Sequence, residues 1–96
     1  MKVEVHPEAE KEFAEAKKWY GQRSRLAARA FVTEISNAIR EVTTSPTRWA
    51  KIAGGPRRFV LSRFPFAIIY RVESEKIIVL AIAHQRRLPG YWRERQ

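Results

Sequence analysis

The chain has 96 residues, no cysteine, a hydrophobic fraction of 45% and a formal net charge of +9. Disulfides and cysteine-based chemistry are therefore excluded, and the longest apolar run is far shorter than the roughly 20 residues that span a bilayer. The N-terminus lacks the apolar core of a signal peptide. We expect one globular domain covering residues 1–96, located in the cytoplasm.

The positive charge is unevenly distributed along the chain. Residues 1–56 contain ten basic and seven acidic residues, whereas residues 57–96 contain nine basic and three acidic residues. Such a field favours nucleic acid, the ribosome or an acidic protein as a partner. The competing interpretation is a basic surface that only keeps the protein in solution.

The first segments predict a short strand followed by a helix. Val3 and Val5 alternate with polar residues, which is typical of a strand. Pro7 suits the first turn of a helix, and the glutamates that follow oppose the positive end of the helix dipole, where we expect them to be solvated. The buried face repeats at intervals of four, three and four residues and consists of Ala9, Phe13, Ala16 and Tyr20.

A second helix is predicted to begin after Ser24, whose side chain can cap it, and to end before Pro46. The connection at residues 21–23 is short, which favours an antiparallel helix hairpin. The apolar stripe of this helix consists of Ala27, Phe31, Ile35, Ala38, Ile39 and Val42.

Three strands are predicted after a loop at residues 47–56. If Val72 pairs with Ile77 across the charged turn between the last two strands, Ile68 is expected opposite Ala81. Both faces of this strand pair are apolar, so one can pack on the helices and the other must be covered by the C-terminal tail or by a partner. The element order predicts an α+β domain in which an N-terminal strand and a helix hairpin pack on an antiparallel sheet of about four strands.

The candidate site is a group of arginines on or beside these strands. Guanidinium groups bind phosphate through several donors in a planar fork, a histidine can transfer a proton, and an aromatic ring can stack on a base. The alternatives are a structural hydrogen bond for the histidine and a tail packed on the sheet for the aromatic residues. The candidates are Arg57, Arg58, Arg63, Arg71, Arg86, Arg87, His84, Tyr91 and Trp92.

Two segments, FPFAIIYRV at residues 64–72 and HQRRLPGYW at residues 84–92, carry a resemblance to a known family. With the preceding elements, they make nearly the whole chain similar to the RelE/ParE superfamily of bacterial toxins. These are the growth-arresting components of type II toxin–antitoxin modules, also known as plasmid stabilisation proteins. The resemblance implies a RelE/ParE-like fold, a toxin that arrests growth, and a small acidic antitoxin as partner in a hetero-oligomer.

The branches of this superfamily differ in their targets. RelE-like members cleave mRNA on the ribosome with a basic cluster on the sheet and a tail tyrosine, and these positions correspond here to Arg58, Arg87 and Tyr91. Two further basic positions of that set fall at Val60 and Ala67 in this sequence. ParE-like members, which poison DNA gyrase, lack the complete nuclease set.

We therefore expect gyrase inhibition, with ribosome-dependent mRNA cleavage as the alternative. In that alternative the catalytic residues are Arg58, His84, Arg87 and Tyr91. The residues expected to bind the target or RNA are Arg57, Arg63, Arg71, Arg86 and Trp92. A third possibility is a non-enzymatic module that binds free DNA or RNA in a strongly salt-dependent way. None of these hypotheses calls for a metal or a cofactor.

Overall fold

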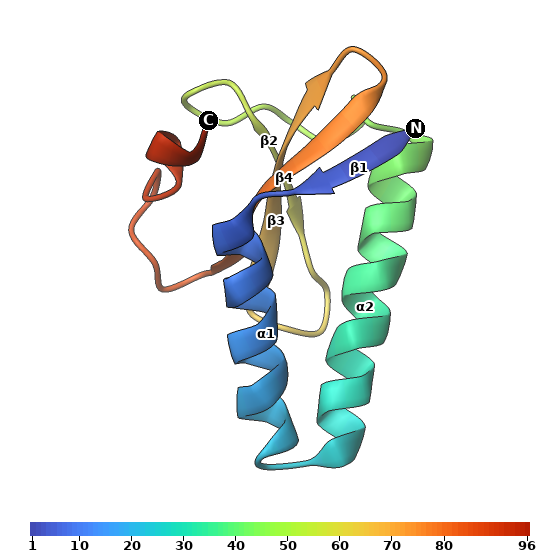
Figure 1. Ribbon diagram of the computed structural model, residues 1–96, viewed down its shortest axis with the longest axis vertical. Coiled ribbons are helices and arrows are strands. Elements are labelled where there is room, and N and C mark those ends of the chain that lie inside the picture. The colour runs from blue at the N-terminus through green and yellow to red at the C-terminus, as the bar shows by residue number, and fades with distance from the viewer.

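A four-stranded sheet with a helix hairpin on one face makes up the computed structural model, which describes residues 1–96 (Figure 1). The expected α+β architecture is confirmed. The elements in chain order are β1 (Lys2–Val5), α1 (Pro7–Gly21), α2 (Arg25–Thr44), β2 (Arg57–Val60), β3 (Phe66–Glu73), β4 (Lys76–His84) and a short 3-10 turn, η1 (Arg93–Arg95).

The sheet has the strand order β1-β4-β3-β2 and is mixed. As expected, β2, β3 and β4 are antiparallel, but β1 lies parallel to β4, with Val3 opposite Ile77. No tight turn joins β1 to β4, because the whole helix hairpin and two strands lie between them in the chain. Antiparallel pairing follows directly only where a hairpin turn connects two strands.

The register of β3 and β4 follows the expectation up to one irregularity. Val72 pairs with Ile77, as predicted, but further along Ile68 lies opposite Ile82 and not opposite Ala81. One extra residue in β4 at Leu80 shifts the pairing, which is the signature of a β-bulge. As a result, Leu80 and Ala81 both pack on the side away from the helices, whereas Ile82 packs with the helix hairpin.

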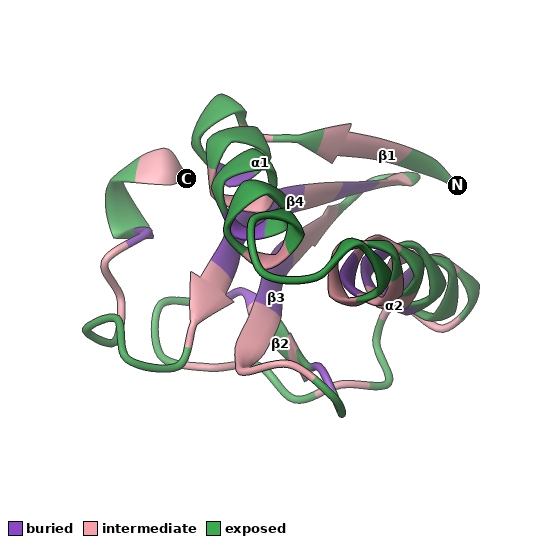
Figure 2. Ribbon diagram, turned by 90° about the horizontal axis from the view of Figure 1, so that it is seen from below, coloured by how far each residue is buried: buried purple, intermediate pink, exposed green.

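The helix hairpin forms as its sequence pattern predicts. Ala9 and Ala16 of α1 are buried, and the Ser24 hydroxyl accepts a 3.2 Å hydrogen bond from the Ala27 N–H at the start of α2. Phe31 is fully buried between the hairpin and the sheet, where its ring lies 5.3 Å from the ring of Tyr20. Figure 2 shows buried residues along the strands and on the inner sides of both helices.

The second face of the sheet is covered by the C-terminal tail. Trp92 is only 3% exposed and packs on Ile69, Leu80 and Ala81. The tail is therefore part of the structure's core, and it borders the groove described below. Neither helix has the length and apolar content needed to cross a membrane.

Candidate target-binding groove

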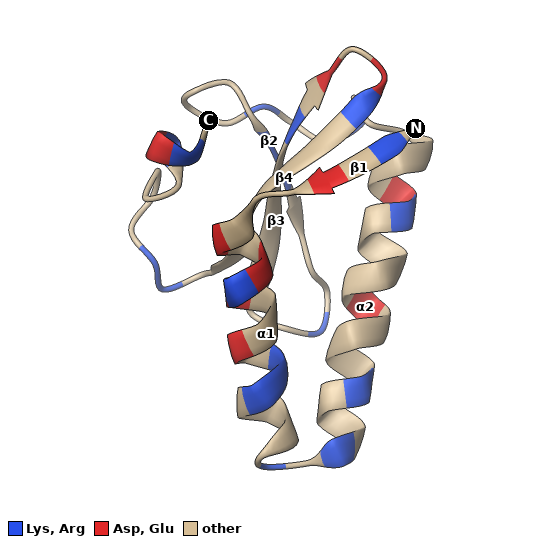
Figure 3. Cartoon of the chain, in the orientation of Figure 1, with Lys and Arg blue, Asp and Glu red and all other residues tan.

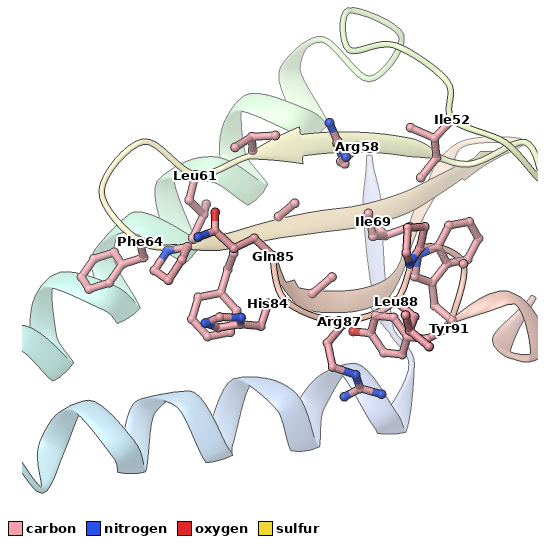
Figure 4. A pocket seen from close by; sticks show the side chains of 18 of the residues that line it. Ile52, Arg58, Leu61, Phe64, Ile69, His84, Gln85, Arg87, Leu88 and Tyr91 are labelled. Carbon is pink, nitrogen blue, oxygen red and sulfur yellow. The ribbon is translucent and has the colours of Figure 1, made fainter.

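A groove of about 610 Å³ lies on the sheet face opposite the helices, between the strands and the C-terminal tail (Figure 4). Arg58 and Arg87 lie at opposite sides of it (Figure 4). Arg63, Arg93 and His84 also line it, and no aspartate or glutamate does. The groove therefore has an uncompensated positive rim, which attracts anionic groups.

The floor of this groove is apolar. Val60 of β2 lies directly opposite Ala67 of β3, and Ala67 in turn lies opposite Ala83 of β4. All three residues line the groove, and Val60 is 60% exposed. The three apolar side chains form a row across three strands. The arginines therefore lie around an apolar strip, and no basic residue lies within the strip itself.

His84 lies at the end of β4 and is held by a local hydrogen bond. Its Nδ1 accepts a 3.1 Å hydrogen bond from the Arg86 N–H, and its ring meets Phe66 edge-on with 5.0 Å between ring centroids. The structural hydrogen bond considered for this residue is thus present. Nε2 makes no hydrogen bond within the chain and is the atom that remains for a ligand.

Arg87 is stacked on the tail tyrosine. Its guanidinium carbon lies 3.8 Å from the centroid of the Tyr91 ring, and that of Arg95 lies 5.0 Å from the same ring. Attraction between a cation and the face of an aromatic ring fixes a side chain that would otherwise be mobile. Arg87 is therefore held at the junction of the groove and a second cleft of about 400 Å³ beside α1.

Glu12 of α1 anchors this arrangement, which corrects the expectation that the first glutamates of the helix are solvated. Its carboxylate accepts a 2.7 Å hydrogen bond from the Tyr91 hydroxyl and two from the Arg95 guanidinium, at 2.9 and 3.0 Å. It also accepts a 3.0 Å bond from the N–H of Ile82. The Glu12 and Arg95 side chains are only 14% and 13% exposed, so this is a largely buried ion pair.

The ion pair also completes an edge of the sheet. The pairing of β1 with β4 reaches only Val79, and beyond it Glu12 binds the N–H of Ile82 while Arg95 donates a 3.1 Å bond to the carbonyl of Leu80. Buried backbone groups need partners, and these two side chains supply them where β1 has ended. One cluster therefore joins α1, β4 and the C-terminal tail.

The cluster shifts the titration of two of its members. Burial raises the pKa of Tyr91 well above its usual value, and the hydrogen bond to Glu12 and the charge of that carboxylate add to the shift. Burial alone would lower the pKa of Arg95, but the hydrogen bond and charge of Glu12 raise it. Near neutral pH, Tyr91 is a neutral hydrogen-bond donor and Arg95 is a cation.

The structure separates the other candidate residues from the groove. Arg57 donates hydrogen bonds to the carbonyls of Thr47 and Trp49, at 3.2 and 2.8 Å, and so holds the preceding loop. Arg71 pairs with Glu73 at 2.9 Å. Arg86 is exposed but does not line the groove.

Trp92 is the remaining candidate of that group. Its side chain belongs to the core and forms part of the groove wall. With 3% exposure, it is not available to stack on a base in this arrangement. The expected set thus divides into residues that meet at the groove and residues that hold loops, turns or the core. The members that meet there are Arg58, Arg63, His84, Arg87, Tyr91 and Trp92.

Arg93 was missed by the sequence reasoning and joins the groove through a turn at Gly90. Gly90 has a φ of 78°, and a Cβ at this position would lie 2.8 Å from the guanidinium carbon of Arg93. The positive φ favours glycine here, and a side chain at this position would also displace the Arg93 guanidinium. The signal available in the sequence was the Pro-Gly pair at residues 89–90, followed directly by further basic residues.

Comparisons with known proteins agree with the fold. A solved structure of the chromosomal ParDE toxin–antitoxin system from P. aeruginosa superposes with a TM-score of 0.73 at 20% identity, covering 88% of this chain and 95% of that chain. No protein of curated function matches the sequence significantly. The family model described as the ParE toxin of type II toxin–antitoxin systems matches residues 3–89. The resemblance noted in the sequence is thereby confirmed, and the chain belongs to the ParE toxin family of type II toxin–antitoxin systems.

Proposed function

We propose that this toxin arrests bacterial growth by inhibiting DNA gyrase and that a small acidic antitoxin neutralises it. The observation that carries the proposal is the apolar floor of the groove, where Val60, Ala67 and Ala83 stand side by side. Gyrase inhibition is the activity that the likeness to ParE-like toxins implies. The geometry of the groove supports a protein as the target in preference to a phosphodiester to be cleaved.

The two candidate targets differ in where they need positive charge in the groove. Cleavage of a phosphodiester requires cations or other donors within about 3 Å of the oxygens on which charge develops. Val60 and Ala67 occupy the positions at which the nuclease branch has two of its basic residues. An apolar centre with charged residues around it is instead the usual composition of a protein–protein interface.

The tail tyrosine adds a second argument. Its hydroxyl is engaged with Glu12 at 2.7 Å, and its raised pKa keeps it protonated near neutral pH. A tyrosine held in this way stabilises the tail, and using it as an acid or base would require breaking the cluster. His84 is then the one histidine that lines the groove and the remaining candidate for a proton-transfer group in a cleavage reaction.

Ribosome-dependent mRNA cleavage remains the second candidate function. It is favoured by one observation, the convergence of Arg58, His84 and Arg87 on the same groove. These residues would act there as phosphate ligands and as a proton donor or acceptor.

The antitoxin is assigned on charge. The solved P. aeruginosa relative is a toxin–antitoxin system, and the groove of this chain has four arginines and no carboxylate. An acidic segment can bind such a surface through charge-assisted hydrogen bonds, while its apolar side chains cover the floor.

The decisive experiment compares the two targets with the same purified toxin. We expect a dose-dependent loss of DNA supercoiling by gyrase together with accumulation of cleaved DNA, and no cuts in mRNA translated on ribosomes. Codon-positioned mRNA cuts with unimpaired supercoiling would overturn the proposal in favour of the nuclease candidate. Salt-dependent binding to free DNA without either effect would point to the non-enzymatic module.

A matched pair of variants tests the groove floor itself. Val60→Glu places a carboxylate on the floor, and Ala50→Glu places one at an exposed loop position that does not line the groove. We expect Val60→Glu to raise the concentration needed for half inhibition of gyrase by about tenfold or more, which is the effect of one central interface residue. Ala50→Glu should act like the unmodified chain; equal losses in both variants would contradict a role for the floor.

A further inference from the structure

The free end of the helix hairpin carries a concentration of positive charge. Residues 17–29, which include the end of α1 and the start of α2, contain five basic residues and no acidic residue. The glutamates of α1 all precede this stretch, with Lys11 as the one basic residue among them, so acidic and basic residues concentrate at opposite ends of the helix (Figure 3). We call this surface the hairpin tip; its basic residues are Lys17, Lys18, Arg23, Arg25 and Arg29.

None of these charges is compensated within the chain. All five side chains belong to exposed residues, and the four ion pairs of the structure involve other lysines and arginines. Fixing five like charges at one end of a small protein raises the energy of the free state through mutual repulsion. A polyanion relieves that repulsion when it binds, so the arrangement favours one as the occupant.

The one exposed large aromatic ring of the hairpin tip, that of Trp19, already has an arginine stacked on it. Trp19 is 51% exposed, but the Arg23 guanidinium lies 3.6 Å from its ring centroid and donates a 2.9 Å hydrogen bond to the Trp19 carbonyl. Apart from Trp19, the exposed large apolar side chain here is Leu26. Two such residues are too few for the core of a protein–protein interface, and a ring already stacked by an arginine is a poor stacking platform for the bases of single-stranded nucleic acid.

We propose that the hairpin tip binds the phosphate backbone of duplex DNA without sequence preference. Duplex DNA carries one fixed negative charge per about 1.7 Å of its axis on a regular backbone, which cations alone can bind. The hairpin projects beyond the sheet, with both helix ends reaching the same end of the molecule (Figure 1). Lysines and arginines from two helices can therefore contact neighbouring phosphates together.

This surface is separate from the groove but adjoins it. Arg29 and Arg63 line a common hollow between α2 and the end of β2, and Arg63 also lines the groove. A toxin that holds a protein target in the groove thus has a second, DNA-binding surface beside it. The inference does not depend on gyrase being that target.

A triple variant and its matched control test the proposal. Lys17→Gln, Arg25→Gln and Arg29→Gln remove three exposed tip charges that form no side-chain hydrogen bond, and Lys2→Gln, Arg48→Gln and Lys51→Gln remove three exposed charges outside residues 17–29. Binding of each full-length protein to a labelled duplex of about 20 base pairs is measured by fluorescence anisotropy at about 50 to 200 mM salt. Thermal melting confirms that each variant is folded.

We expect the unmodified chain to bind with a steep salt dependence and the tip variant to lose affinity by about tenfold or more at low salt. The slope of log K against log salt should fall by about 3 in the tip variant, because each lost phosphate contact removes roughly 0.9. The control variant should keep most of the slope. Equal losses in both variants, or no duplex binding by the unmodified chain, would overturn the proposal.

Two further measurements distinguish duplex DNA from other ligands of the hairpin tip and keep this proposal separate from the function proposed above. A single-stranded RNA of equal length should bind more weakly than the duplex, and tighter binding of the RNA would contradict the assignment. The affinity for the acidic antitoxin should be unchanged in the tip variant; a loss there with intact DNA binding would make the hairpin tip an antitoxin surface. DNA binding is measured without gyrase, so its outcome is independent of the supercoiling assay.

Discussion

The carboxylate of Glu12 accepts a 2.7 Å hydrogen bond from the hydroxyl of Tyr91, which lies 79 residues further along the chain. The same carboxylate pairs with Arg95 and binds the N–H of Ile82. The first helix, the bulged strand β4 and the C-terminal tail therefore depend on one side chain. Arg87 stacks on the Tyr91 ring, so the position of this arginine at the rim of the groove depends on Glu12 as well.

Removing the charge of Glu12 is expected to destabilise the fold strongly. Glu12→Gln leaves the largely buried Arg95 without its counter-ion and places an amide against a guanidinium. We expect the free energy of unfolding, measured in urea, to fall by roughly 2–4 kcal/mol. Glu15→Gln, on the exposed side of the same helix, is the control and should change it by less than about 0.5 kcal/mol. Similar effects of the two substitutions would show that the ion pair does not hold the tail.

Tyr91→Phe is expected to produce a pH-dependent loss of stability. The variant keeps the ring under Arg87 but loses the bond to Glu12, at a cost of about 1–2 kcal/mol near neutral pH. The pKa of Tyr91 is raised in the folded protein, so the native state holds the proton more tightly than the unfolded chain, whose tyrosines titrate near pH 10. The stabilisation by Tyr91 is complete up to about pH 9 and is lost progressively as pH rises through and above about pH 10.

The measurement is the free energy of unfolding of both proteins between about pH 7 and pH 11. The free energy of unfolding of the unmodified protein should exceed that of Tyr91→Phe by a constant amount up to about pH 9, and this difference should then shrink. Tyr20 and Tyr70, whose pKa values burial also raises, are present in both proteins, so their contributions cancel. A difference that stays constant across the whole range would contradict the raised pKa.

Trp92 and Trp19 form a matched pair for the role of the tail. Trp92→Ala removes a ring that is 3% exposed and packs on the second face of the sheet, and we expect a loss of about 3–5 kcal/mol. Trp19→Ala removes a ring that is half exposed and should cost less than about 1 kcal/mol. Thermal unfolding checks both values, and equal costs would mean that the tail does not contribute to the core.

Arg86 and Arg87 are neighbours in sequence with different surroundings. Arg87 lines the groove and is stacked on Tyr91, whereas Arg86 is exposed and lines neither the groove nor the cleft beside α1. Arg87→Gln is expected to reduce growth arrest and target inhibition by about tenfold, because a rim cation is lost. Arg86→Gln removes the same charge and should leave both unchanged. Identical effects would indicate that only net charge matters.

Local patterns were sufficient to predict much of the fold. The stripe that includes Ala9 and Ala16, the cap at Ser24 and the pairing of Val72 with Ile77 are all observed. Each of these depends on residues within a few positions of one another, so periodicity and turn chemistry determine them. The two apolar faces of the last strand pair were also evident, and with them the need for a cover.

The bulge in β4 could not be predicted from the same pattern. The apolar run from Ile77 to Ala83 gives no sign of where alternation breaks, and the expected pairing of Ile68 with Ala81 was therefore wrong. Just beyond the bulge, where β1 has ended, the N–H of Ile82 is bound by Glu12 of α1. This partner lies 70 residues away in the chain, so the apolar run of β4 gives no sign of it.

For the site, local motifs were enough to indicate the family and an arginine-rich sheet and tail. The three-dimensional arrangement sets which arginines meet, since Arg57 and Arg71 have partners of their own while Arg93 enters the groove. It also decided that Val60, Ala67 and Ala83 form one apolar floor. Strand pairing and ion pairs such as that of Glu12 join residues far apart in the chain, and their energy depends on burial, which a local pattern does not contain.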